Sequence, residues 1–455
     1  MNKGTVYLHP VGCPKANVDR EKLGGLLESR AYRIVDSPSE ASIAIVFGCA
    51  FIDDAKRESI DDILNLSSPG AGRPEHIIVA GCMPEKYGEE LRLSLPEVDV
   101  FVGNSMLREL PGIVASIIGG KRPHRLMTGG TGQTGLLAGA PVRIRPETGF
   151  WTRAVLIGDG CDNGCTYCSI PHMRGRLRSR SIAGILEETD LLVKQGAKEL
   201  VLAGQDTASF GRDGTNNPGL AALLSDIAGR YPGVWTRLSY VNPDNLDSDV
   251  AGVIAEHSNV CNYVDLPIQH ASPRILKAMG RGDRPEVLEE KIRRFRKAVP
   301  ELSLRTSLIL GFPGETEEDM EDLTGFLKKI EFDMVGVFAF SPQPGTPAAD
   351  FPDHVPEEIV QDRILEVVAL QDEISHLRME RLVGRELKVL VEDPLESGES
   401  SARSQYDMAE VDRLIRIKDC KAPPGSFASV RIESVSGPYE WTATQIHTLG
   451  SGHEY

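Results

Sequence analysis

The stretch that decides the fold runs from Gly160 to Pro171 and reads GCDNGCTYCSIP. It contains Cys161, Cys165 and Cys168 in the spacing C-x-x-x-C-x-x-C. Three thiolates this close together can ligate one iron–sulfur cluster, because soft sulfur ligands suit iron and zinc. Structural zinc sites usually take four ligands in two separated pairs, and no fourth ligand lies near this group. The spacing therefore favours a four-iron cluster with one iron left open; a zinc knuckle or three unconnected buried cysteines are the alternatives.

Three further cysteines, Cys13, Cys49 and Cys82, share a different pattern. Each follows a short apolar run, over residues 5–8, 43–47 and 77–80, that is typical of a buried parallel strand. Helix-like stretches follow, for example 17–29 and 53–66. Loops at the carboxyl ends of parallel strands converge, so these cysteines can meet in space, and helix N-termini favour their thiolate forms. The plainer alternative is three buried cysteines at strand ends.

The rest of the chain is organised around these two sets of cysteines. Residues 1–118 alternate strand and helix patterns and predict a small α/β unit. The glycine-rich segment 119–149 is interpreted as a linker, because its GGTGQTG run lacks the Gly-Lys-Ser/Thr ending of a phosphate loop. Residues 379–450 read as short strands with turns, which favours a small β-barrel; these strands are expected at 385–392, 414–419, 426–435 and 440–445.

The central segment, 150–378, repeats a strand-then-helix pattern. Strands are expected at 154–157, 200–203, 236–240, 263–266, 304–310 and 335–340. Helices fall between them, as at 182–194 and 317–330. Six such units suggest a barrel or partial barrel, whose functional groups belong at the carboxyl ends of the strands. The cysteine triplet follows the first of these strands.

Composition narrows the class of protein. The chain has 455 residues, of which 41% are hydrophobic and 25% charged, as is ordinary for a globular protein. No apolar run is long enough to span a membrane, and the N-terminal residues turn polar too early for a signal peptide. We therefore expect a cytoplasmic protein without disulfides. The net charge of −16, and −3 over residues 381–455, favours a basic partner over nucleic acid.

At this point the residues resemble a known family. GCDNGCTYCSIP is similar to the radical S-adenosylmethionine (SAM) signature, and the three upstream cysteines with the C-terminal β-barrel resemble the methylthiotransferases. Within that family, several segments resemble the enzymes that modify an aspartate of a ribosomal protein: VGCPKANVDREKL, SRSIAGILEE, LAGQDTASFGRDG, YVDLPIQHASPRILKAMGR, RTSLILGFPGETEEDMEDL and FAFSPQPGTPA. The chain departs from the pattern at Arg20, where the family often has Ser, and at Phe47-Gly48, where it usually has Asn-Thr.

The resemblance implies a fold and a chemistry. The fold would be a Rossmann-like N-terminal domain, a partial TIM-type (β/α)6 radical-SAM barrel and a TRAM domain. Two 4Fe–4S clusters are implied, one on Cys161, Cys165 and Cys168 that binds S-adenosylmethionine, and an auxiliary one on Cys13, Cys49 and Cys82. The reaction would proceed by radical hydrogen abstraction at the β-carbon of an aspartate, sulfur insertion and methyl transfer. No catalytic residue is expected beyond the cluster ligands, because the cofactors carry the hard chemistry.

Several residues would contact S-adenosylmethionine by their positions in the family motifs: Gly204, Gln205, Gln269, Gly311, Pro313 and Gly314. Each has a structural alternative, since Gly204-Gln205 and Gly311–Gly314 also suit strand-to-helix turns. His270 is expected to be a satisfied structural histidine. The arginines at 174, 176, 178 and 180 suggest either a solvated face or a carboxylate partner, and Cys261 and Cys420 are interpreted as ordinary residues.

The implied partners are a basic ribosomal protein, the twelfth of the small subunit, and a flavodoxin- or ferredoxin-type electron donor. We expect no membrane association and a monomer. Two alternatives stay open. The nearest relatives in the family methylthiolate an adenosine of tRNA, and a non-catalytic iron–sulfur carrier would also explain the cysteines, though not the six strand–helix units.

Overall fold

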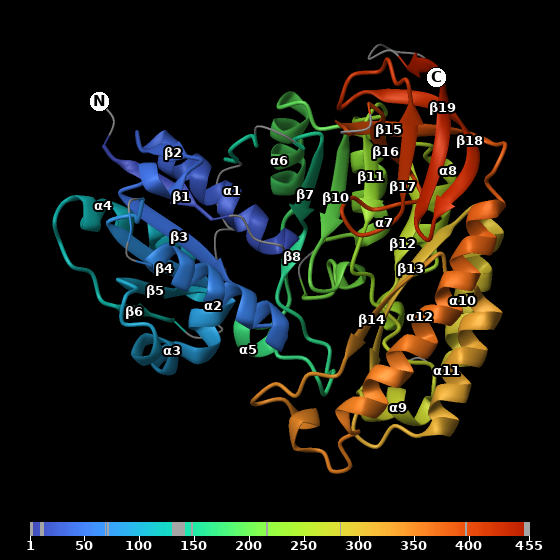
Figure 1. Ribbon diagram of the computed structural model, residues 1–455, viewed down its shortest axis with the longest axis horizontal. Coiled ribbons are helices and arrows are strands. Elements are labelled where there is room, and N and C mark those ends of the chain that lie inside the picture. The colour runs from blue at the N-terminus through green and yellow to red at the C-terminus, as the bar shows by residue number, and fades with distance from the viewer. Residues whose placement is uncertain are drawn as a thin grey trace.

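The computed structural model describes residues 3–9, 13–68, 70, 72–129, 142–146, 149–214, 217–282, 284–395 and 398–449. Figure 1 shows the N-terminal unit in blue on the left, a large central unit in green to orange, and a C-terminal unit in red against the upper end of the central one. This arrangement confirms the mixed α/β class with a small C-terminal barrel that the sequence predicted.

The N-terminal unit is a parallel sheet whose described strands follow the order β2-β1-β3-β4-β5-β6. The strand β3 forms because its run IAIVFG is apolar and β-branched, and all of its residues are buried between helices on both faces. The strands are β1 (Thr5–Leu8), β2 (Arg33–Val35), β3 (Ile43–Gly48), β4 (His76–Gly81), β5 (Val100–Gly103) and β6 (Leu126–Met127). The helices are α1 (Pro14–Ser29), α2 (Asp53–Ser67), α3 (Cys82–Ser94) and α4 (Leu110–Ile118), with 3-10 turns η1 (Pro38–Glu40) and η2 (Asn104–Glu109).

The central unit holds a second parallel sheet, in the order β14-β13-β12-β11-β10-β7 through the described residues. Its outer face packs on helices through the largest apolar core of the chain. The strands are β7 (Thr152–Leu156), β10 (Glu199–Ala203), β11 (Trp235–Leu238), β12 (Val260–Asp265), β13 (Ser303–Leu310) and β14 (Met334–Ala339). All six strands expected from the sequence are present within a few residues. No pairing joins β14 to β7 among these residues, so the barrel is partial.

Helices and short elements connect these strands. The helices are α5 (Ile170–Arg174), α6 (Ile182–Lys194), α7 (Leu220–Arg230), α8 (Asp249–Glu256), α9 (Pro273–Ala278), α10 (Pro285–Ala298), α11 (Glu317–Ile330) and α12 (Glu357–Glu380). The pair β8 (Gly158–Asp159) and β9 (Arg178–Ser179) and the turns η3 (Thr207–Ser209), η4 (Pro243–Asn245) and η5 (Pro347–Asp350) complete the unit. Helices α6 and α11 begin where the sequence predicted, because Ser181 and Thr316 cap them.

The C-terminal unit is a closed barrel of the described strands β15-β16-β17-β19-β18. Trp441 and alternating aliphatic residues fill its interior. The strands are β15 (Glu386–Pro394), β16 (Ser400–Ser404), β17 (Leu414–Lys418), β18 (Phe427–Gly437) and β19 (Glu440–Leu449). The sequence analysis missed β16, whose SSARS residues carry no apolar alternation, and also missed β2, β5, β6, β8 and β9.

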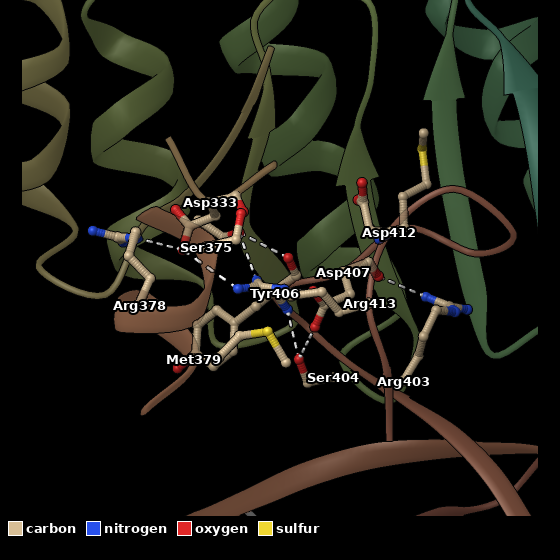
Figure 2. Close-up of polar contacts among 12 residues, drawn as sticks. Asp333, Ser375, Arg378, Met379, Arg403, Ser404, Tyr406, Asp407, Asp412 and Arg413 are labelled. Atoms are coloured by element: carbon tan, nitrogen blue, oxygen red, sulfur yellow. Dashed lines mark hydrogen bonds and ion pairs between the residues drawn. The ribbon is translucent and has the colours of Figure 1, made fainter. Parts of the chain in front are cut away.

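The C-terminal barrel packs against the amino ends of the central strands, and buried ion pairs join the two. Glu199, the first residue of β10, accepts hydrogen bonds from Arg237 and Arg403, each at 2.6 Å. Figure 2 shows the neighbouring cluster, in which Arg413 lies between Asp407 and Asp333. An apolar layer that contains Trp151, Trp235 and Leu390 lies beside these pairs.

Part of the stretch expected to be a linker has regular structure. Residues 126–127 add β6 to the edge of the first sheet. Arg143 is buried and donates to both Glu21 of α1 and Glu188 of α6 at 2.7 Å, so it ties the two units together. Residues 130–141 and 147–148 lie outside the described part of the chain, and the GGTGQTG segment falls there except for its first glycine.

Candidate functional site

The cysteine triplet lies on the loop between β8 and α5, at the carboxyl ends of the central strands. The end of α9 holds this loop by its backbone. The amide of Thr166 donates to Met279 O at 3.0 Å, and its hydroxyl donates to Ala278 O at 2.8 Å. Gly280 has a φ of +71°, and a Cβ there would lie 2.5 Å from Gly164 O. The triplet therefore sits on a fixed backbone whose support, Gly280, the sequence analysis did not single out.

The three thiols of the triplet lie close enough to act on one another. Burial raises the pKa of Cys161 to about 11, opposed by a hydrogen bond from the Asn163 amide. Burial raises the pKa of Cys168 to about 12, and the charges of Cys165 and Cys161 raise it further. Metal binding at these thiols must therefore displace protons.

The second set of cysteines comes together as the strand pattern predicted. Cys13 caps the N-terminus of α1, Cys49 follows β3, and Cys82 is the first residue of α3 after β4. Burial raises the pKa of Cys49 to about 11, and the charges of Cys82 and Cys13 contribute to this rise. The fold thus brings three cysteines that are up to 69 positions apart in the chain close to one another, at the carboxyl ends of strands of the first sheet.

Helix α5, which directly follows the triplet, connects the two sets. The side-chain amide of Asn104 donates to Cys82 Sγ at 3.2 Å and to Met173 O at 3.1 Å. Arg174 is buried and forms ion pairs with Asp159 at 3.0 Å and Asp19 at 3.4 Å. The charges of Cys82 and Cys13 also act on its guanidinium. The two candidate cluster sites are therefore parts of one region.

The arginines after the triplet divide into two kinds. Arg174 and Arg180 are bound by carboxylates of the chain itself, Arg180 by Glu188 at 2.7 Å. Arg176 is exposed and lies 3.2 Å from Asp162. The reading of this run as one solvated face is wrong for Arg174, because burial and two ion pairs fix it in the interior.

Gly204 and Gln205 follow β10 and line a small hollow beside the triplet. Its other walls include Gly160 and Leu177. The Oε1 atom of Gln205 is buried and has no hydrogen-bond partner among the described residues, whereas Asp206 caps the turn η3. A buried acceptor without a partner is costly, so this hollow fits a ligand that donates a hydrogen bond. Together with three thiols near which the described residues offer no fourth cysteine, it fits a cluster with a bound cofactor.

Gln269 and His270 follow β12 and differ in their surroundings. Gln269 has a φ of +71°, which is rare for a non-glycine residue, and its amide donates to Ser307 O at 2.9 Å. His270 is fully buried: its Nδ1 accepts from the Ser272 amide, and its Nε2 lies 3.4 Å from Glu315. His270 is therefore buried as a structural histidine would be, but it is only partly satisfied, because its Nε2 has no hydrogen-bond partner among the described residues.

The loop at 311–314 is explained by the turn itself. Gly311 has a φ of +75°, and a Cβ there would lie 2.4 Å from the side chain of Val360. Its amide donates to Glu315 Oε1 at 2.9 Å. Gly314 has a φ of +78°, and Thr316 and Asp319 form the capping box of α11. Packing and backbone conformation thus account for both glycines without a cofactor contact, and Pro313 lies between them.

The lone cysteines lie away from both sets. Cys261 is buried in the apolar layer beneath the barrel, and Cys420 packs against the C-terminal core. In the part of the chain that the structure describes, no three His, Cys, Asp or Glu side chains converge on a point for a single metal ion. The thiolates of a four-iron cluster bind different irons and need not converge in this way. None of the described helices is long and apolar enough to cross a membrane.

Comparison with known families agrees with this geometry. Residues 155–327 match the Radical SAM superfamily, residues 5–103 match the Uncharacterized protein family UPF0004, and residues 383–445 match the TRAM domain. The partial barrel with a cysteine triplet at its carboxyl end therefore defines a radical SAM protein.

Relatives of known name cover almost the whole chain. The ribosomal protein uS12 methylthiotransferase RimO of Syntrophus aciditrophicus is 38% identical over 95% of this chain and 96% of that protein. The enzyme of the same name from Geobacter sulfurreducens is 39% identical over 95% of this chain and 97% of that protein. The chain belongs to the RimO family of radical SAM methylthiotransferases.

A solved structure supports the fold alone. The radical S-adenosylmethionine methyltransferase TsrM from Kitasatospora setae, solved with cobalamin and a [4Fe-4S] cluster bound, superposes with a TM-score of 0.56 at 16% sequence identity. It covers 76% of this chain and 77% of its own.

Proposed function

We propose that this chain methylthiolates the β-carbon of an aspartate in ribosomal protein uS12. The observation that carries the proposal is the full-length similarity to enzymes named uS12 methylthiotransferase. The placement of two cysteine sets in one region supports it, because sulfur transfer to a carbon radical requires both centres to reach the same substrate atom. The division of the chain at 1–118, 119–149, 150–378 and 379–450 is part of the proposal.

Each cysteine set has a role. Cys161, Cys165 and Cys168 hold a 4Fe–4S cluster that binds S-adenosylmethionine, and Cys13, Cys49 and Cys82 hold a second one. When bound, these groups supply the electron, the radical chemistry, and the sulfur and methyl groups. The chain supplies placement: Gln205 offers a buried acceptor to the cofactor, and Gln269 lies at a strained position in the barrel mouth.

The charge of the chain favours a protein substrate. The net charge is −16, so the field of the whole molecule repels phosphate backbones and attracts a basic ribosomal protein. A ribosomal substrate places the reaction in the cytoplasm. We further propose that the enzyme is a monomer and takes electrons from a flavodoxin- or ferredoxin-type protein.

A competition assay tests this function. The reconstituted enzyme receives S-adenosylmethionine, reductant and sulfide under anaerobic conditions, with equal amounts of uS12 and tRNA, and mass spectrometry locates any methylthio group. We expect a methylthio-aspartate on uS12. A methylthio-adenosine would overturn the substrate and leave the chemistry standing. Intact clusters without cleavage of S-adenosylmethionine would instead indicate an iron–sulfur carrier. The variant Cys420→Ala should give the same product as the native enzyme, because this cysteine lies in the C-terminal barrel.

A further inference from the structure

Lys15 lies where the two cysteine sets meet. It is two residues after Cys13, in the first turn of α1. Its ammonium stands 3.7 Å from the centre of the Tyr240 ring, at the carboxyl end of β11 in the other unit. Its charge also acts on the Cys168 thiol. One lysine thus lies close to Cys13 in sequence, acts on a thiol of the triplet, and contacts a residue at the carboxyl end of β11.

Lys22, about two turns further along the same helix, has an ion-pair partner that Lys15 lacks. Lys22 is buried and forms an ion pair with Glu188 at 2.9 Å. Among the described residues, no carboxylate lies within ion-pair distance of Lys15, whose contact is the aromatic ring. A half-buried ammonium on a ring, with no anion of its own, suits an anionic ligand that arrives from outside.

The backbone of Tyr240, whose ring contacts Lys15, is strained. Tyr240 has a φ of +56°, which costs free energy for an aromatic residue. Asp265 accepts from its amide at 2.9 Å, and its carbonyl accepts from the Thr207 amide at 3.0 Å. Val18, one turn after Lys15, packs with Leu156 and Ala203 at the carboxyl ends of β7 and β10. Both partners of the contact are therefore fixed in advance.

We propose that Lys15, which the Tyr240 ring holds in place, binds the side-chain carboxylate of the substrate aspartate. The inference rests on the proposed function for the identity of the substrate. A carboxylate held there places the adjacent β-carbon between the two cysteine sets. The site distinguishes an aspartate from an asparagine, because only the charged group gains a charge-assisted hydrogen bond from the ammonium.

A double-mutant cycle between enzyme and substrate tests this site. The enzyme variant is Lys15→Gln, and the substrate variant is uS12 with its modified aspartate, mapped first by mass spectrometry, changed to asparagine. Binding of labelled uS12 to the reconstituted enzyme is measured by fluorescence anisotropy without reductant, so that no turnover occurs. We expect the native enzyme to bind native uS12 ~10- to 100-fold more tightly than the asparagine variant. Lys15→Gln should bind both equally, and Lys15→Arg should restore part of the preference.

Controls separate this inference from the proposed function. Lys328→Gln, an exposed lysine on α11, should keep the native preference. An effect of Lys15→Gln on the affinity for S-adenosylmethionine alone would assign the site to the cofactor's own carboxylate and overturn the proposal. The proposal would also be overturned if Lys15→Gln kept the preference for native uS12 over the asparagine variant. If the native enzyme neither binds nor modifies uS12, the proposed function is refuted instead.

Discussion

At the amino ends of the central strands, each buried charge has its counter-charge within the chain. Glu199 is held by Arg237 and Arg403, and Arg413 by Asp407. At the carboxyl ends, two polar side chains have no charged partner among the described residues. Gln205 has a buried acceptor without a partner, and Lys15 stands on an aromatic ring. Both ends of the barrel thus carry charged and polar side chains that are buried or half-buried.

This difference between the two ends of the barrel distinguishes two roles of buried polar side chains. A buried ion pair that is complete within the chain fixes one arrangement of two units, and breaking it is expensive. A buried polar group that lacks a partner keeps part of its binding capacity for a ligand. In barrels of this kind the carboxyl end carries chemistry and the opposite end carries stability. The following predictions test whether this division holds.

The largest expected effect is at the carboxyl end. Changing Cys161, Cys165 and Cys168 together to alanine should abolish cleavage of S-adenosylmethionine and remove ~4 irons per chain. Thermal unfolding of the metal-free chain should change little, because these side chains are only partly buried. Iron analysis, absorbance spectra and a cleavage assay measure this. Iron content that stays at the native level would contradict the assignment of the triplet.

The next effect is at the amino end. Glu199→Gln leaves Arg237 and Arg403 without their common counter-ion in the interior, which should cost about 3–5 kcal/mol. All three tryptophans of the chain lie in or beside the junction, so urea unfolding followed by their fluorescence reports on it. Glu386→Gln removes an exposed ion pair with Arg431 and should cost under ~1 kcal/mol. Equal effects of the two variants would break the contrast between the ends.

The same residue predicts a dependence of stability on pH. Burial alone raises the pKa of Glu199, but Arg403 and Arg237 outweigh it and lower this pKa from 4.5 to about 2. The unfolded chain therefore takes up this proton at higher pH than the folded one. The contribution to stability, on the order of 3 kcal/mol, is present above about pH 4.5 and is lost as the pH falls toward 2. Glu199→Gln should show a shallower loss than the native chain over this interval in urea titrations.

The smallest effect distinguishes two glycines at the carboxyl end. Gly311→Ala should destabilise the chain by about 1–3 kcal/mol, because of its positive φ and the side chain of Val360. Gly204→Ala should leave stability within ~0.5 kcal/mol, since a Cβ there meets no atom closer than 3.6 Å. It should instead weaken binding of S-adenosylmethionine. Thermal melts measure the stability of both variants, and titration measures their affinity for S-adenosylmethionine. A severe loss of stability in Gly204→Ala would show that Gly204, like Gly311, is required by the fold.

Much of the fold is predictable because strand patterns and caps are local. The strand at 5–8 and the helices at 182–194 and 317–330 were predicted to the residue. The strands that were missed form because of their hydrogen bonds to neighbouring strands, and not because of a hydrophobic pattern in their own sequence. The strand β16 is polar along its length and exists through its neighbours β15 and β17. The two-residue strand β6 likewise depends on its pairing with β5.

The site is predictable only in part. The cysteines carry their own spacing signal, and their gathering followed from strand order. The contacts of Lys15 with Tyr240 and of Arg174 with Asp19 join residues more than 150 positions apart, and no local pattern reports them. At Gly311 the motif suggested a cofactor contact, which stays a prediction; the side chain of Val360 on α12 gives an additional reason why no larger residue fits there.

The ion pairs of α1 have a consequence for how the sequence can vary over evolution. Lys22 with Glu188, and Glu21 with Arg143 and Arg153, are buried contacts between units. Loss of the Glu188 carboxylate removes the ion-pair partner of the buried Lys22, so mutations at positions 22 and 188 should be inherited together. Exposed pairs such as Asp54 with Arg57 impose no such coupling. Correlated substitution among related genes should therefore trace the contact between α1 and the barrel.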